Sequence, residues 1–148
     1  MAKLKKLMRL EFGTGVMMSF FTDVNVTLVC NEGGDYSLST SFFEEETLPD
    51  GKNRHIERIK EKSLSAQEGD KLLGDLRLLG VFDWESDYGD PENIQEDTQP
   101  WGLDLTYEDG SLESHYGIYP YPEHFREFLE VLGAAAGYDL VACFNNLN

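Results

Sequence analysis

The chain has 148 residues, of which 41% are hydrophobic; this is enough for one sizeable core and too little for two, so we predict a single domain over residues 1–148. The formal net charge is −16, and residues 78–148 carry 15 acidic side chains against one basic side chain, Arg126. Because such a surface repels phosphate backbones and anionic lipid, the composition argues against nucleic-acid and membrane partners and favours a basic protein partner or a cation; acidity kept only for solubility is the simpler alternative.

The first part of the chain predicts an antiparallel hairpin. Three segments have the alternating apolar residues of strands: residues 4–12, 24–30 and 36–42. The alternation is irregular in residues 4–12 and regular in the other two segments. Matching the apolar faces pairs Cys30 with Tyr36 across the three-residue loop Glu32-Gly33-Gly34. In such a loop Gly34 takes the left-handed conformation of a bulge.

The middle of the chain predicts a loop, an edge strand and a helix. Residues 44–53 contain a Pro-Asp-Gly turn and are predicted to be a loop. Residues 54–62 are predicted to be an exposed strand, because their basic side chains suit a sheet edge. Ser65 and Glu68 have the spacing of a capping box, so a helix is expected to begin there and to continue as a leucine stripe up to Gly80.

Residues 81–100 are predicted to be a long acidic loop. Their carboxylates at alternate positions resemble a calcium loop, but an EF-hand needs glycine at its sixth position and glutamate at its twelfth, where this chain has Tyr88 and Ile94. The histidines and cysteines do not have the spacing of a zinc motif. We therefore predict a solvated loop and assign no metal site.

Residues 101–118 read as a second hairpin that turns at Asp109-Gly110, since an Asp-Gly pair between alternating apolar residues favours a two-residue turn. This turn pairs Tyr107 with Leu112 and sets most apolar side chains on one face. A slip by one residue is disfavoured because it would turn charged residues toward the core.

On the other face, this register places Asp104 opposite His115 and Thr106 opposite Glu113. A carboxylate that orients a histidine is a common arrangement for a general base or a metal ligand, although an ordinary cross-strand ion pair has the same pattern. Asp104, Glu113 and His115 therefore form an alternative candidate site.

The end of the chain predicts a second helix over residues 122–133, with Pro122 in its first turn. Residues 139–144 are read as a short last strand or a packed tail. Together the elements predict an α+β fold: an antiparallel sheet of two hairpins plus flanking strands, with two amphipathic helices, 65–79 and 122–133, on one face.

The sequence names no reaction and no cofactor. It has no G-x-S-x-G, no G-x-G-x-x-G and no P-loop, and neither cysteine has a histidine neighbour, so we assign no catalytic residue and do not favour an enzyme. Arg9 interrupts the apolar run that a signal peptide would need. With only Cys30 and Cys143, a reducing cytoplasmic setting is expected, and a single bridge between them stays open.

The order of these pieces resembles small bacterial proteins of the emfourin type, which inhibit metallopeptidases. The matching pieces cover about two-thirds of the chain: Glu32-Gly33-Gly34, Leu64-Ser65 with Leu72 and Leu76, Leu105-Thr-Tyr107-Glu-Asp109-Gly110, and Pro122 with Phe128 and Leu132. The resemblance implies a protein that binds and inhibits another protein. It transfers no functional residue to this chain.

The charge asymmetry predicts a cytoplasmic protein-interaction module, an inhibitor or immunity-like protein, that binds a basic partner surface. Tyrosines beside acidic loops are common interface anchors. The predicted partner-binding residues are Tyr119, Tyr121, Trp84, Asp87 and Asp90. The alternative is a small cation-binding protein or enzyme that uses Asp104, His115 and neighbouring carboxylates.

Overall fold

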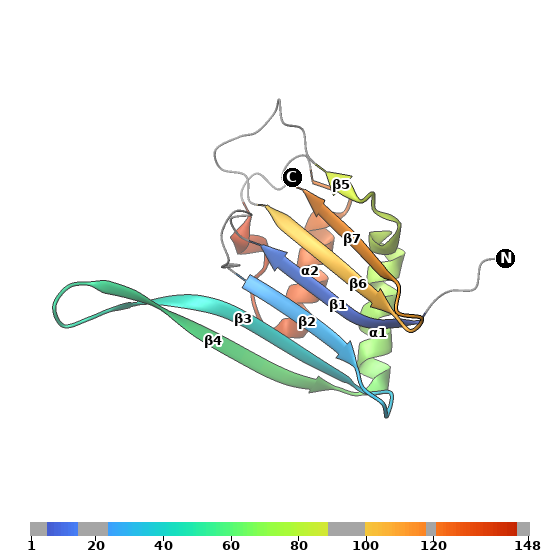
Figure 1. Ribbon diagram of the computed structural model, residues 1–148, viewed down its shortest axis with the longest axis horizontal. Helices are drawn as coiled ribbons and strands as arrows, with labels where there is room; N and C mark the ends of the chain where they lie inside the picture. The colour runs from blue at the N-terminus through green and yellow to red at the C-terminus, as the bar shows by residue number, and fades with distance from the viewer. Residues whose placement is uncertain (1–5, 15–23, 89–99, 118–120, 145–148) are drawn as a thin grey trace.

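Figure 1 shows one sheet with two helices against it; this computed structural model describes residues 6–14, 24–88, 100–117 and 121–144. The strands are β1 (Leu7–Thr14), β2 (Val24–Cys30), β3 (Tyr36–Thr47), β4 (Asn53–Leu64), β5 (Asp87–Tyr88), β6 (Trp101–Tyr107) and β7 (Leu112–Gly117). The helices are α1 (Ala66–Leu78) and α2 (Phe125–Ala136), with the short 3-10 helices η1 (Val81–Asp83) and η3 (Val141–Cys143).

The seven strands form a single sheet in the order β4-β3-β2-β1-β6-β7-β5. Each neighbouring pair is antiparallel except β5 and β7, which are parallel. The predicted α+β class and its largely antiparallel sheet are therefore confirmed. β1 lies inside the sheet because it pairs with the hairpin β2–β3 on one side and with β6–β7 on the other.

Both helices pack on the same face of the sheet (Figure 1). The Tyr36 hydroxyl donates a hydrogen bond to the Asp70 carboxylate of α1, and the Phe12 ring lies 5.1 Å from the Phe128 ring of α2. Paired residues on neighbouring strands project to the same face, and Val26 pairs with Phe12 of β1 and with Thr40 of β3. Tyr36 lies four residues before Thr40 in β3, an even spacing, so Tyr36 and Phe12 project to the same face. We call this the covered face, and the opposite one the open face.

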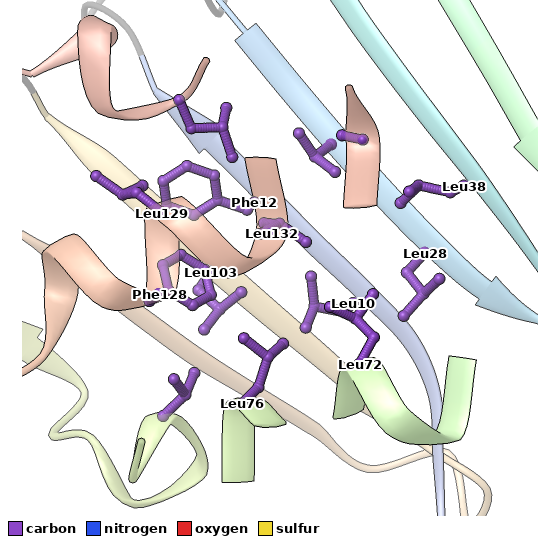
Figure 2. Close-up of a cluster of buried hydrophobic side chains, with 14 of the residues drawn as sticks. Leu10, Phe12, Leu28, Leu38, Leu72, Leu76, Leu103, Phe128, Leu129 and Leu132 are labelled. Atoms are coloured by element: carbon purple, nitrogen blue, oxygen red, sulfur yellow. The ribbon is translucent and has the colours of Figure 1, made fainter. Parts of the chain in front are cut away.

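The covered face holds the hydrophobic core (Figure 2). Leu10 and Phe12 of β1 and Leu103 of β6 meet Leu76 of α1 and Phe128 of α2, and each of these side chains is 0% exposed. Burial of such a side chain contributes roughly 1.5–3 kcal/mol. The two helices are therefore fixed on the sheet by apolar contact.

Each of the three hairpins whose turn the structure describes has a three-residue loop that ends in glycine. Backbone hydrogen bonds join the two residues that flank each loop. Gly34, Gly51 and Gly110 have φ of +92°, +84° and +84°, the left-handed region that glycine adopts without a Cβ clash. The register predicted for the first hairpin, with Cys30 opposite Tyr36, is confirmed.

The loop predicted over residues 44–53 is wrong for most of its length. β3 continues to Thr47, and only residues 48–52 turn. The acidic run is accommodated in a strand because basic side chains face it from β4: a carboxylate oxygen of Glu46 lies 2.7 Å from an Arg54 guanidinium nitrogen. The β3–β4 ribbon consequently extends beyond the end of β2 (Figure 1). The predicted exposed edge strand is confirmed as β4.

The register predicted for the hairpin β6–β7 is wrong by one residue. Leu103 lies opposite His115, because the turn is the three-residue loop 108–110 and only Gly110 in it has positive φ. The charge burial that argued against this register does not arise at Glu113, whose side chain is 48% exposed near the end of the strand. His115 does turn inward, where it bonds to the Glu85 carbonyl oxygen in the segment before β5.

The first helix is confirmed with its capping box: the Ser65 hydroxyl accepts from the Glu68 amide, and the Glu68 carboxylate accepts from the Ser65 amide, both at 3.0 Å. α2 begins later than predicted, at Phe125, and continues past Gly133 to Ala136.

Residues 139–144 contain η3 and no strand; Leu140 and Phe144 are buried, so the packed-tail alternative holds. Cys30 and Cys143 form no disulfide with each other. Among the described helices, none has the length and apolar character needed to cross a membrane.

Candidate functional site

An aromatic cluster lies on the covered face at the end of the sheet where β6 begins. The Trp101 ring lies 5.7 Å from the Trp84 ring, which follows η1, and 5.1 Å from the Phe125 ring of α2. Trp84 also contacts Phe128 at 5.2 Å and is only 8% exposed. Such ring pairs contribute about 0.5–1.5 kcal/mol beyond burial. Trp84, predicted at the partner surface, therefore lies in the core in this structure.

Tyr121 reaches the same cluster from the start of α2. Its ring is stacked on the Phe125 ring at 4.9 Å with an interplanar angle of 3°, and it meets Phe144 edge-on at 5.7 Å. These contacts leave Tyr121 half-buried. Its ring packs mainly on the core, and only its exposed part could contact a partner.

Asp87 is the predicted partner-binding residue that the structure places plainly at the surface. It is exposed in β5, and the next residue, Tyr88, has its ring 6.0 Å from Trp101. Asp87 therefore lies at the rim of the aromatic cluster. Tyr119 and Asp90 lie outside the described residues.

The acidic side chains of the second half are exposed wherever the structure describes them. Every aspartate and glutamate that the structure describes after position 80 is exposed. Arg126, the one basic residue of residues 78–148, has its Nε 3.1 Å from a carboxylate oxygen of Glu130. The positive charge of this half is thus held within a local ion pair.

The alternative site is not assembled. Asp104 lies on the open face, opposite Ser114, whose hydroxyl donates to its carboxylate at 2.7 Å. His115 lies on the covered face, because Leu103, its partner across the strands, is a core residue. The prediction failed because its register was wrong by one residue: it placed Asp104 and His115 on the same face, whereas the sheet places them on opposite faces.

His115 is a buried structural residue. Its Nδ1 lies 2.8 Å from the Glu85 carbonyl oxygen, and because a carbonyl can only accept, Nδ1 carries the proton. Its Nε2 is 3.9 Å from a Glu113 carboxylate oxygen and has no hydrogen-bond partner in the described part of the chain. The ring therefore ties β7 to the segment before β5.

Glu113 has a second neighbour, Tyr107, whose hydroxyl donates to its carboxylate at 3.2 Å. Burial and the nearby Glu113 carboxylate together raise the pKa of Tyr107 to about 12. This bond is part of the covered face near the hairpin tip. Over the described residues, no group of three or more histidine, cysteine, aspartate or glutamate side chains is placed to hold a metal ion.

A patch on the open face of the β3–β4 ribbon was not predicted from the sequence. Ile59 of β4 is 59% exposed and lies opposite Ser41, with Phe43, itself 36% exposed, on the same face of β3. The sequence of β4 contains a pattern that could have indicated this patch. Its Lys and Arg residues occupy even positions, and Glu57 and Glu61 occupy odd positions on the same face as Ile59, as expected for a strand whose side chains alternate between two faces.

Comparisons of the chain with protein-family models, with curated proteins and with solved structures find no match. The resemblance to emfourin-type inhibitors stays a prediction.

Proposed function

We propose that this protein is an interaction module that binds a basic surface of a partner protein through its acidic second half. The observation that carries the proposal is the separation of its charges: the described acidic residues after position 80 are all exposed, and Arg126 is paired with Glu130. A surface of one sign attracts an oppositely charged partner and speeds the encounter. Asp87, at the rim of the aromatic cluster, is the contact residue we favour.

The basic side chains of the first half offset this field only weakly, because several of them are paired with acceptors of the same chain at its surface. Arg54 is paired with Glu46. Lys60 donates to the Gly137 carbonyl oxygen at 3.2 Å, at the C-terminal end of α2, where the helix carbonyls carry partial negative charge. The outward-facing charge therefore stays negative.

An inhibitor or immunity-like role is the form of binding that we favour. A small acidic domain can block an enzyme or toxin whose functional surface is basic, and the emfourin-type resemblance points to the same class of activity. The sheet and helices supply a rigid base for such a surface, so binding would require little ordering of the chain.

The test measures binding of a short poly-L-lysine peptide by two charge-matched variants. One carries Glu85→Lys with Asp87→Lys, and the control carries Glu32→Lys with Asp50→Lys; all four positions are exposed. Because both variants change the net charge equally, a difference between them reports location. We expect the first variant to bind at least severalfold more weakly, and wild-type affinity to fall between about 50 and 300 mM salt.

Two results would contradict the proposal. Binding by the wild-type protein that does not change with salt would remove the electrostatic basis. Equal weakening in both variants would show a general attraction to an acidic molecule and no role for the second half.

A further inference from the structure

The open face of the β3–β4 ribbon combines exposed apolar surface with negative charge. Ile59 is the most exposed residue of this apolar patch, and Glu57 and Glu61 flank it on β4. All three side chains project from the open face, because they alternate with residues of the covered face. The open face of β4 therefore presents an aliphatic side chain with a glutamate two residues away on each side.

The charges of β4 are sorted by face. Its basic residues are at even positions and project to the covered side, where Arg58 lies 3.1 Å from Glu44 and Lys62 donates to the Ala135 carbonyl oxygen at 3.3 Å. The open side of β4 therefore has glutamates as its charged side chains in the described part of the strand. This sorting makes the two sides of one strand opposite in charge.

Beside Ile59 the ribbon has a shallow hollow of about 240 Å³. It is lined by Ser37, Leu38, Ser39, Glu61, Lys62 and Ser63, and the Lys62 ammonium is directed to the covered side, where it donates to the Ala135 carbonyl oxygen. Ser39 lies directly opposite Glu61, and Ser41 lies opposite Ile59, so the hollow and the apolar patch adjoin along the strand. Hydroxyl and carboxylate oxygens are the acceptors that an ammonium or guanidinium group needs.

We propose that this open-face patch is a docking surface for a partner segment in which a lysine or arginine stands next to an aliphatic residue. The cation would enter the hollow and bond to Glu61 and the serine hydroxyls, while the aliphatic group packs on Ile59. The inference goes beyond the proposed function, because it adds a contact surface in the first half. It rests on that function in one respect, the basic character of the partner.

Charge complementarity selects this occupant over a second copy of the chain. Across the centre of the open face, Glu11 of β1 lies opposite Asp104 of β6, and the nearest cation, Arg9, is 3.7 Å from Glu11. Two open faces brought together would oppose carboxylates to carboxylates. A basic segment meets the same surface with attraction.

The experiment uses a labelled peptide of alternating lysine and valine as probe. Binding is measured by fluorescence anisotropy, and the contact surface is mapped by amide chemical-shift changes in the full-length protein. We expect shift changes concentrated at Ser39, Ile59 and Glu61. A variant with Glu57→Lys and Glu61→Lys should bind about tenfold more weakly. Ile59→Ser should weaken the lysine–valine probe and leave a lysine–serine probe of equal charge unchanged.

The charge-matched control is the variant with Glu32→Lys and Asp50→Lys, which should keep most of the binding. If the variant with Glu57→Lys and Glu61→Lys binds as well as this control, or if the shift changes avoid the ribbon, the open-face surface is overturned. Weaker binding by the variant with Glu85→Lys and Asp87→Lys would then leave the proposed function standing. If the wild-type protein binds neither lysine probe, both the open-face docking surface and the proposed function are overturned. Sedimentation that depends on protein concentration in the wild type, and not in Ile59→Ser, would assign the patch to self-association and overturn the inference.

Discussion

The two faces of the sheet show how one set of strands serves two purposes. Leu10 and Glu11 are neighbours in β1, but Leu10 is fully buried under the helices, whereas Glu11 is half-exposed among the polar residues of the open face. The covered face therefore carries the stability of the fold, and the open face is free to change with little effect on it. Substitutions at alternate positions should separate stability from binding.

The largest expected difference is between Leu10→Ala and Leu112→Ala. Leu10 is 0% exposed on the covered face, and Leu112 is 61% exposed on the open face. We expect Leu10→Ala to reduce the free energy of unfolding by about 2–5 kcal/mol and Leu112→Ala to change it by less than about 0.5 kcal/mol. Urea unfolding followed by circular dichroism measures both, and similar losses in the two variants would break the comparison.

A smaller difference is expected between Gly117→Ala and Gly102→Ala. A Cβ at Gly117 would collide with the Tyr88 carbonyl oxygen of β5, whereas at Gly102 it meets open space. We expect Gly117→Ala to cost about 1–3 kcal/mol as β5 is displaced. Hydrogen exchange of the Tyr116 amide, which donates to the Ser86 carbonyl oxygen at 3.1 Å, reports that displacement directly. Unchanged Tyr116 protection in Gly117→Ala would show that β5 is not held at this point.

Ser65→Ala and Ser63→Ala compare two serines separated by one residue. Ser65 caps α1, and Ser63 lies on the open face. Removing the cap should cost about 1 kcal/mol, while Ser63→Ala should stay within about 0.5 kcal/mol of wild type. The unfolding midpoint of each variant decides this, and equal midpoints would mean that α1 is held by packing alone.

The smallest effect is expected at alkaline pH, through two tyrosines of the covered face. Burial, with the Asp70 carboxylate, raises the pKa of Tyr36, and burial with Glu113 raises that of Tyr107 from 10.0 to about 12. Because these tyrosines lose their protons at lower pH in the unfolded chain than in the folded protein, their protonated forms stabilise the fold below about pH 10. This contribution to the free energy of unfolding is lost as the pH rises through the pKa values of the folded protein.

The free energy of unfolding should therefore fall between about pH 10 and 12, and fall less steeply in Tyr107→Phe. Unfolding curves at several alkaline pH values, with tyrosinate absorbance as a second readout, measure this. The same slope in wild type and Tyr107→Phe would exclude Tyr107 as a source.

The sequence by itself determined the elements whose signals are local. The capping box at Ser65 and the alternation of β2 and β3 depend on residues near one another in the chain, and the structure has both. The class of the fold followed from the same signals. The partner-binding role of the charge asymmetry stays a proposal, because no single chain shows its partner.

The tertiary structure alone decided which face each residue of β7 occupies. An Asp-Gly pair fits a two-residue or a three-residue loop, and the choice moves every following side chain to the other face. The three-residue loop is compatible with the core because the Glu85 carbonyl oxygen bonds to His115 and β5 pairs with Gly117, and both contacts come from a distant part of the chain. Local pattern fixed the existence of the hairpin, and long-range packing fixed its register.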